Sequence, residues 1–336
     1  MPDNIKVVFF QRKPYPFHKS LEYIFDDVRS RMPAYITSIT KVFSEYSKGI
    51  IPRIKIALEA RNNQGDVNHV TGDVHFASLM LDKKKTMLTV LDCGMLNDST
   101  GIKQDLLKFF WFTLPLKKCS VVTVISDATR REMHRYTSYP DDRIITIPVA
   151  ISPAYRHHPK SFNKAKPRIL LVGTTHNKNL LRVIEAVSTI SCELHIIGRL
   201  NDEMLGRLSQ LNVSYTNAFD LTQEQIVQAY TDCDMLSFVS TYEGFGMPIV
   251  EANAVGRPVI TSNILSMPEV AGDAACLVDP LNVEEIRAGI KRIIEDDSYR
   301  EDLIAKGLEN CKKYDPQVIA NQYLRVYEEL HAGKYN

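Results

Sequence analysis

The chain has 336 residues, more than one hydrophobic core usually supports, so two domains are expected. With 44% hydrophobic and 24% charged residues, its composition is that of an ordinary globular protein, which excludes a disordered or fibrous chain. Residues 1–160 hold 24 Lys and Arg against 16 Asp and Glu, whereas residues 161–336 hold 17 against 24, so the net charge of +1 conceals a basic and an acidic half. The basic half suits an anionic substrate or an anionic membrane surface; the alternative is unevenly charged solvated faces without a partner.

The six cysteines are widely separated and form no Cys-x-x-Cys pair, which argues against a disulfide framework and against a zinc site. Residues 1–6 lack the basic and apolar character of a secretion signal, and no window approaches the roughly 18 apolar residues that cross a bilayer. We therefore expect a cytoplasmic protein without a nucleic-acid partner, with peripheral contact at the inner face of the membrane as an alternative.

The first half of the chain is expected to contain strands at residues 5–10, 55–58, 87–91, 120–125 and 144–147, and a helix over 129–136. Residues 106–118 are aromatic and flanked by lysines, and they predict either a buried helix end or a segment that docks at a membrane interface. The proline and polar content of residues 141–167 indicates a connection, so the expected domains are 1–155 and 156–336.

The second half alternates strands and helices more clearly. Strands are expected at 168–172, 193–197, 235–239, 259–260 and 276–278. One helix is expected to begin at 180 and another to end near 231, and three more are expected over 248–255, 282–295 and 316–332. Thr222 with Gln225 predicts a capping box for the helix that ends near 231. This alternation predicts a doubly wound parallel sheet, in which ligands bind beyond the carboxyl ends of the strands. The last helix, 316–332, could also pack back toward the first domain.

Residues 240–259 carry the densest constraints. Gly244 and Gly246 precede an expected helix start, where backbone N–H groups can approach an anion such as phosphate. Glu251 follows within that helix and can accept hydrogen bonds from sugar or ribose hydroxyls. The alternative is a tight turn in which Glu251 only complements the helix dipole.

This segment resembles the donor-binding signature of the group 1 (family 4) glycosyltransferases, which have the GT-B fold of two facing Rossmann-like domains. Glu243 and Glu251 match its two glutamates separated by seven residues, with Gly-Phe-Gly-x-Pro between them. The continuation through Gly256–Ile260, Met267–Gly272 and Ala275–Pro280 is similar too, as is the upstream lysine element at Lys178.

The resemblance implies a retaining hexosyl transfer from a nucleoside-diphosphate sugar to a hydroxyl of a surface glycan, such as lipopolysaccharide, or of a lipid-linked saccharide. It implies that Lys178 neutralises the leaving diphosphate, that Glu243 contacts the transferred sugar, and that Glu251 holds the ribose. It implies no metal and no other cofactor. The donor-binding residues so implied are Gly173, Thr174, Lys178, Glu243, Gly244, Phe245, Gly246, Met247, Pro248 and Glu251, and the catalytic candidates are Glu243, His69 and Asp92.

The chain also departs from the family pattern. Leu91 stands before Asp92 where many relatives have histidine, so either His69 or His75 substitutes for it or turnover is weak. The alternative for His69 and His75 is a structural role, with their hydrogen bonds satisfied inside the domain. Thr174 stands where some relatives have a phosphate-binding arginine, which leaves Arg182, Arg199 or the helix terminus alone to supply that charge.

Two other functional readings follow from these departures and from the fold. The first is a GT-B nucleotide-sugar-binding protein with weak or no activity, and the second is a sugar-nucleotide epimerase, which the Glu243 and Glu251 pattern disfavours. Asp232-Cys-Asp234 spells a metal-binding motif of a different transferase fold, although acidic residues are ordinary at such a helix-to-strand junction.

Overall fold

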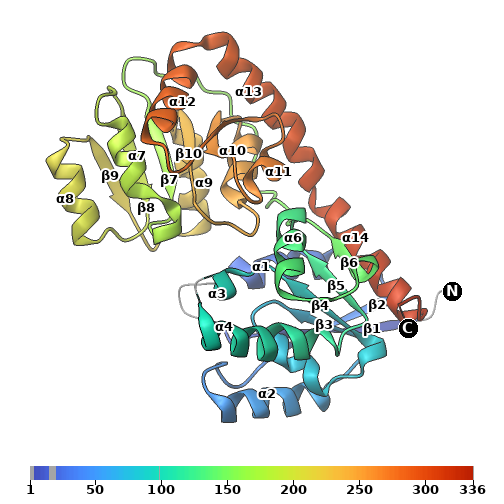
Figure 1. The fold of residues 1–336 in the computed structure, drawn as a ribbon. Coiled ribbons are helices and arrows are strands. Elements are labelled where there is room, and N and C mark those ends of the chain that lie inside the picture. The colour runs from blue at the N-terminus through green and yellow to red at the C-terminus, as the bar shows by residue number, and fades with distance from the viewer. Residues whose placement is uncertain (1–3, 15–19, 98, 336) are drawn as a thin grey trace. The chain divides into compact units, whose positions relative to one another are not determined.

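The computed structural model describes residues 4–14, 20–97 and 99–335, and the chain divides into two compact units (Figure 1). Unit 1 consists of residues 1–150 together with 316–336, and unit 2 consists of residues 151–315. The division falls slightly before the boundary expected at 155, and the last helix belongs to unit 1. Within the described ranges, no helix is both long and apolar enough to cross a bilayer.

The sheet of unit 1 has six parallel strands in the order β2-β1-β3-β4-β5-β6. Strands β3, β4 and β5 are buried along their whole length, as expected of parallel strands that are covered on both faces. The strands are β1 (Ile5–Gln11), β2 (Ile36–Val42), β3 (Val67–Thr71), β4 (Thr86–Val90), β5 (Val121–Val124) and β6 (Ile144–Thr146).

Two layers of helices cover this sheet. On one face, α1 (Ser20–Ser30) packs against α14 (Pro316–His331), and Phe9, Phe25 and Tyr327 belong to the core beneath them. On the other face, the core is closed by α2 (Ile50–Arg61), η1 (His75–Met80), the π-helical turn η3 (Lys108–Thr113) and α5 (Leu114–Leu116). Further helical segments are η2 (Lys83–Lys85), α3 (Gly94–Asn97), α4 (Gly101–Leu107), α6 (Asp127–Tyr136) and η4 (Asp141–Arg143).

The strand expected at residues 55–58 is wrong, because these residues lie inside α2. Ile56, Ala57 and Ala60 turn toward the core at helical spacing. A short apolar run does not distinguish a strand from a buried helix segment. Strand β2, which the sequence pattern did not reveal, occupies the edge of the sheet and is half exposed.

The sheet of unit 2 also has six parallel strands, in the order β12-β11-β10-β7-β8-β9. Strands β7 and β10 are neighbours at its centre, where the chain passes from one half of the sheet to the other. This is the switch point at which open α/β sheets bind ligands. The strands are β7 (Arg168–Val172), β8 (Glu193–Ile197), β9 (Tyr215–Ala218), β10 (Met235–Phe238), β11 (Val259–Ser262) and β12 (Ala275–Val278).

The helices of unit 2 confirm the predicted alternation. Thr222 and Gln225 form the expected capping box at the start of α9. Doubly wound parallel sheets, predicted for both halves of the chain, are therefore confirmed. The helical segments are η5 (His176–Lys178), α7 (Leu180–Val187), α8 (Asp202–Gln210), α9 (Gln223–Asp232), α10 (Met247–Val255), α11 (Met267–Ala271), α12 (Val283–Glu295), α13 (Asp297–Asn310) and η6 (Cys311–Tyr314).

Candidate active site

Two loops meet at the switch point of unit 2, one after β7 and one after β10. The first loop turns at Gly173, whose φ of 91° disfavours any residue with a side chain. A Cβ atom at this position would also lie 2.9 Å from Cε of Lys178. Glycine therefore allows Lys178 to fold back over the end of β7. The predicted donor-side residues Gly173, Thr174, Lys178, Glu243, Gly244, Phe245, Gly246, Met247 and Pro248 all lie on these two loops and the first turn of α10.

Two asparagines that the sequence reasoning did not single out fasten the loops together. The backbone N–H of Thr241 donates to the carbonyl of Asn177 at 2.8 Å, and Nδ2 of Asn177 donates to the carbonyl of Tyr242 at 2.9 Å. Asn179 is buried with a left-handed φ of 59°, and its Nδ2 donates to the carbonyl of Val239 at 3.0 Å. The position of Lys178 relative to the β10 loop is therefore fixed by backbone contacts on both sides.

Lys178 and Glu243 form an ion pair at the centre of this arrangement. Nζ of Lys178 lies 2.7 Å from Oε1 of Glu243, and the two side chains are only 21% and 15% exposed. The same ammonium group lies 4.7 Å from the ring centroid of Phe238. The ammonium group of Lys178 can therefore bind a phosphate group when the Glu243 carboxylate turns away to another partner.

The start of α10 faces the same loops. Ser266 precedes α11 but makes no capping bond there. It donates its hydroxyl to the carbonyls of Glu243 and Phe245, at 2.9 and 2.8 Å. Gly246 has a φ of 110° and ends the loop, so α10 begins at Met247. The first N–H groups of a helix lack intrahelical partners and favour an anion.

Glu251 lies in the second turn of α10, and two tyrosines hold it. The hydroxyl of Tyr230 donates to Oε2 of Glu251 at 2.5 Å, and the hydroxyl of Tyr155 is a second hydrogen-bond partner. The rings of the two tyrosines pack edge to face, with their centroids 5.4 Å apart. Burial raises the pKa of Glu251, and the two tyrosine hydrogen bonds oppose that shift. No local signal could have revealed these tyrosines, because they come from other segments of the chain.

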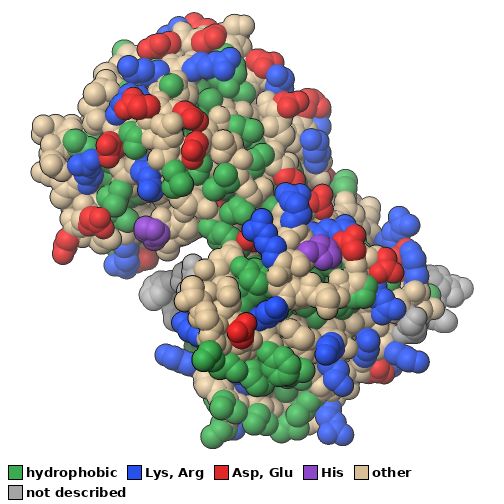
Figure 2. Space-filling view, viewed as in Figure 1, with side chains coloured by type: hydrophobic (Ala, Val, Ile, Leu, Met, Phe, Trp, Pro, Cys, Tyr) green, Lys and Arg blue, Asp and Glu red, His purple; other side chains and the backbone are tan. Residues whose placement is uncertain are grey.

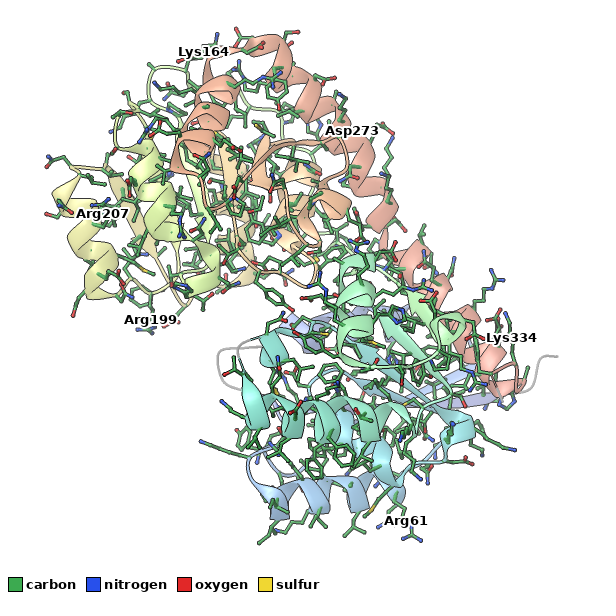
Figure 3. The ribbon with its side chains drawn as sticks, viewed as in Figure 1. Arg61, Lys164, Arg199, Arg207, Asp273 and Lys334 are labelled. Carbon is green, nitrogen blue, oxygen red and sulfur yellow. The ribbon has the colours of Figure 1, made fainter. Side chains whose placement is uncertain are left out.

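The two arginines expected to compensate for Thr174 have partners of their own. Thr174 donates its hydroxyl to the carbonyl of Arg199 at 2.8 Å. The Arg199 side chain pairs with Asp220 and points away from unit 2 (Figure 3). Arg182 donates to Oδ1 of Asn179 at 2.9 Å, which keeps its guanidinium at the first turn of α7.

His69 is not available for catalysis, which corrects the sequence-based assignment. Its side chain, on β3, is completely buried. Nδ1 lies 2.9 Å from the hydroxyl of Tyr327, and Nε2 lies 2.7 Å from Oγ1 of Thr89. Burial lowers its pKa to about 3, so the ring stays neutral. A histidine without exposed surface cannot contact a sugar.

His75 cannot substitute for it either, because its ring is 4% exposed and its Nδ1 bonds the carbonyl of Trp111 at 2.9 Å. Asp92 does lie where a ligand could reach it. It follows β4 at the carboxyl edge of the unit 1 sheet, is exposed, and accepts the N–H of Gly94 at 2.8 Å. The part of Asp92 in catalysis remains a prediction, and Leu91 beside it is half-buried.

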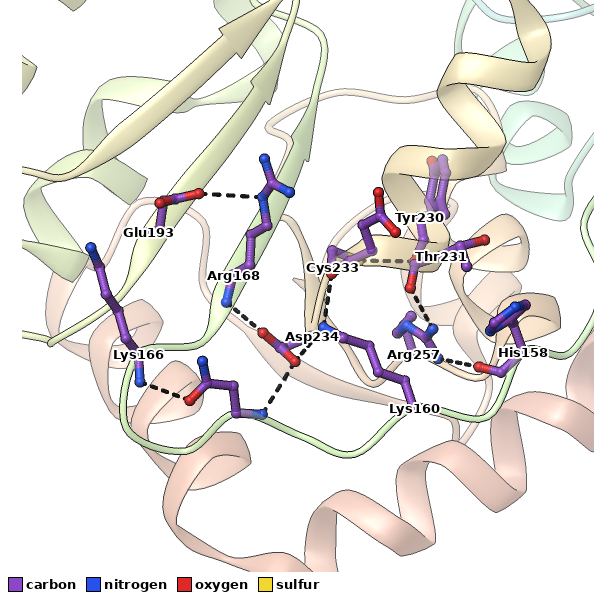
Figure 4. Close-up of polar contacts among 12 residues, drawn as sticks. His158, Lys160, Lys166, Arg168, Glu193, Tyr230, Thr231, Cys233, Asp234 and Arg257 are labelled. Carbon is purple, nitrogen blue, oxygen red and sulfur yellow. Dashed lines mark hydrogen bonds and ion pairs between the residues drawn. The ribbon is translucent and has the colours of Figure 1, made fainter.

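The Asp-x-Asp sequence has a structural explanation (Figure 4). Asp234 is 4% exposed, pairs with Nζ of Lys160 at 2.6 Å and accepts the backbone N–H of Arg168 at 2.7 Å. It therefore fastens the connecting segment to the start of β7. Among the described residues, no group of three His, Cys, Asp or Glu side chains is arranged to hold a metal ion.

The protein has two doubly wound units, which is the arrangement of the GT-B class of α/β proteins. In unit 2, a lysine, two carboxyl groups and a helix N-terminus gather around the switch point. Solved structures agree. The chain superposes on Anabaena HepE in complex with UDP and glucose with a TM-score of 0.79 at 15% identity, covering 96% of this chain and 99% of that one. It superposes on WaaG, a glycosyltransferase involved in lipopolysaccharide biosynthesis, with a TM-score of 0.71 at 14% identity, covering 96% and 99%.

Residues 156–310, which lie within unit 2, match the family model of glycosyl transferases group 1. It is 30% identical over 240 residues to O-antigen chain mannosyltransferase B of Escherichia coli, covering 64% of this chain and 62% of the relative. It is 24% identical over 174 residues to an N,N'-diacetylbacillosaminyl-diphospho-undecaprenol alpha-1,3-N-acetylgalactosaminyltransferase of Campylobacter jejuni, covering 49% and 45%. The chain thus spans less than two thirds of the length of these relatives.

Proposed function

We propose that this protein transfers a hexose, with retention of anomeric configuration, from a nucleoside-diphosphate sugar to a hydroxyl of a glycan or lipid-linked saccharide. The observation that carries the proposal is the Lys178–Glu243 pair beside the start of α10, at the switch point of unit 2. The relatives named as mannosyltransferases favour mannose as the transferred sugar.

In the proposed reaction, the bond between the sugar's anomeric carbon and the diphosphate oxygen breaks, and a bond to the acceptor oxygen forms on the same face. The acceptor's proton passes to the departing phosphate oxygen. Lys178 leaves Glu243 to neutralise the charge that grows on the diphosphate, and the N–H groups of Gly246 and Met247 add partial positive charge. Glu243 then faces the sugar, where its carboxylate stabilises oxocarbenium character. Glu251 accepts the ribose hydroxyls, and no metal enters the scheme.

The experiment is a donor panel with product analysis. The protein is incubated with GDP-mannose, UDP-glucose, UDP-galactose, UDP-N-acetylglucosamine and ADP-glucose, with and without glycolipid acceptors. Acceptor-dependent release of the nucleoside diphosphate is expected with one donor, and NMR of the product should show the anomeric configuration of that donor. Inversion of configuration, or interconversion of donor sugars without an acceptor, would contradict the proposal.

A second candidate is a nucleotide-sugar-binding protein without transferase activity. The burial of His69 and His75 favours it, since neither ring can replace the histidine absent at Leu91. It predicts binding of a nucleoside-diphosphate sugar in the same panel, with no release of diphosphate for any acceptor.

A lipid-linked acceptor would require the protein to work at a membrane surface. We include peripheral attachment on the cytoplasmic side in the proposal, and the basic balance of residues 1–160 supports it.

A further inference from the structure

Helix α2 of unit 1 is apolar on two opposite faces. Its inner face supplies Ile56, Ala57 and Ala60 to the core. Its outer face carries a second apolar stripe at i, i+1, i+4 and i+8, and the exposed fractions of these side chains are Ile50 75%, Ile51 69%, Ile54 50% and Leu58 42%. Packing of unit 1 explains only the inner face, so the outer stripe requires a separate reason.

A second stripe runs along α4 into the π-helical turn η3. Trp111 and Phe112 point into the core, while four large side chains face outward at i, i+4, i+7 and i+8. These are Ile102, 80% exposed, Leu106, 54%, Phe109, 45%, and Phe110, 53%. Residues 106–118 were expected to be either a buried helix end or a segment that docks at a membrane interface. The structure buries Trp111 and Phe112 and leaves Leu106, Phe109 and Phe110 exposed.

The two stripes belong to one surface of unit 1. The guanidinium of Arg53 on α2 lies 4.6 Å from the ring centroid of Trp111 on η3, so the two helical segments are neighbours. In Figure 2, hydrophobic side chains gather on the part of unit 1 where Figure 1 places α2 and α4. We call the eight exposed side chains of the two stripes the apolar face. Eight large apolar side chains exposed on one surface of a domain are unusual, and they mark an interaction site.

The segments that carry the apolar face are rich in basic residues. Residues 48–61 and 101–118 contain eight Lys and Arg but only two acidic residues, Glu59 and Asp105. Glu59 is already paired with Lys41. Arg61, at the end of α2, points away from the unit (Figure 3). The segments that carry the apolar face therefore have a strongly positive charge.

A basic pocket of about 500 Å³ adjoins η3. Lys108, which precedes the exposed Phe109 and Phe110, is one of its walls. The pocket lies at the amino ends of β4, β5 and β6, the edge of the sheet opposite to Asp92. Its basic lining consists of Lys83, Lys108, Lys117, Arg135 and Arg143, together with His134, whose Nε2 contacts Asp141 at 2.7 Å. No carboxylate is among the described residues that line the pocket.

We propose that the apolar face docks on an anionic lipid bilayer, and that the basic pocket beside it takes the phosphate of a lipid headgroup. Isoleucine, leucine and phenylalanine enter the boundary between headgroups and acyl chains, while the lysines and arginines of residues 48–61 and 101–118 meet the negative lipid surface. A second copy of the chain is a less suitable partner for the apolar face. A symmetric dimer would bring the basic residues of these segments close to the same residues of the other copy, and like charges repel. The proposal rests on the surface of unit 1 and holds whether or not unit 2 transfers a sugar.

The test is co-sedimentation of the full chain with phosphatidylcholine vesicles, with and without phosphatidylglycerol. Binding is expected only to the anionic vesicles, and high salt should weaken it. Phe109→Ser combined with Phe110→Ser, and separately Lys117→Gln combined with Arg143→Gln, should each weaken partitioning by about tenfold.

Matched variants in unit 2 serve as controls. Leu205→Ser with Leu281→Ser replaces side chains that are 41% and 62% exposed, and Lys291→Gln with Lys306→Gln removes the same charge. Both should bind vesicles like the parent. Donor turnover with a water-soluble acceptor should not change in the unit 1 variants, and circular dichroism verifies their folding.

Three results would overturn the inference. The first is equal binding of the parent to neutral and anionic vesicles, and the second is parent-like binding by both unit 1 variants. The third is a concentration-dependent dimer in light scattering that Phe109→Ser with Phe110→Ser abolishes, since the apolar face would then join two copies. Failure of transferase activity with intact vesicle binding would refute only the proposed sugar transfer.

Discussion

The ion pair between Lys178 and Glu243 leads to a prediction that separates affinity from turnover. The two charged atoms lie 2.7 Å apart, and the side chains are 21% and 15% exposed. At an effective dielectric constant of about 20, this separation corresponds to roughly 6 kcal/mol of Coulomb attraction before the cost of desolvation. In the unliganded protein, Glu243 therefore neutralises much of the charge that a diphosphate would meet.

Glu243→Ala removes this competitor for Lys178. We expect the variant to bind a free nucleoside diphosphate about 3 kcal/mol, or roughly 150-fold, more tightly, because at the same effective dielectric constant of about 20 a carboxylate about 5 Å from a phosphate charge no longer opposes it. Lys178→Ala should weaken the same complex by about tenfold or more, since a charge-assisted contact is lost. Glu243→Ala should nevertheless lose most of its turnover, because the carboxylate that faces the sugar is gone.

The assay is isothermal titration with GDP, UDP and ADP, followed by turnover with the donor that binds best. Glu284→Ala is the control for net charge, because that side chain is 77% exposed and pairs with Arg287 in the same unit. If Glu243→Ala weakened diphosphate binding as much as Lys178→Ala does, the reasoning would be refuted, because Glu243 would then support the nucleotide instead of competing with it.

Three further predictions follow from the buried groups and the loop. Glu251→Ala should weaken nucleoside diphosphate binding by about 1–3 kcal/mol in titrations, because hydrogen bonds to the ribose are lost, and parent-like affinity would remove Glu251 from the site. Folding lowers the pKa of His69 from 6.5 to about 3. The contribution of the neutral ring to the free energy of unfolding is therefore complete above pH 6.5. Between pH 6.5 and 3 this contribution falls by up to about 1.4 kcal/mol per pH unit. Urea unfolding of His69→Gln between about pH 7 and pH 5 should show a shallower pH dependence than the parent, and an unchanged slope would contradict this assignment. Gly246→Ala should lower the free energy of unfolding by about 1–3 kcal/mol because its φ is 110°, whereas Gly206→Ala in α8, with open space around the added methyl, should not lower it.

The donor side of the candidate site could be predicted because its signals are local. Gly173 and Gly246 mark turns directly after strands, and Lys178 and Glu243 follow strands that are neighbours at the switch point. A short stretch of sequence therefore determines both the conformation of each loop and the edge of the sheet at which it lies.

The remaining features depend on contacts that are distant in the sequence. His69 was assigned to catalysis as a substitute for the histidine that is missing at Leu91. Its partner Tyr327, however, is 258 residues away and fixes it in the core. The clamp on Glu251 likewise combines Tyr155 and Tyr230 from separate segments. Burial of a polar side chain depends on which element covers it, and neither periodicity nor composition contains that information.

The packing of α14 on unit 1 has a consequence for the order in which the protein folds. Unit 1 is interrupted by residues 151–315, so unit 2 is synthesised completely before the helix that covers Phe9, Phe25 and His69. At ordinary rates of translation, this face of the nascent unit 1 stays uncovered for roughly 10 to 30 seconds. During that interval unit 2 can complete its sheet from residues already available. Shortening the chain before Pro316 would therefore expose the hydrophobic core of unit 1 and leave every strand of unit 2 in place.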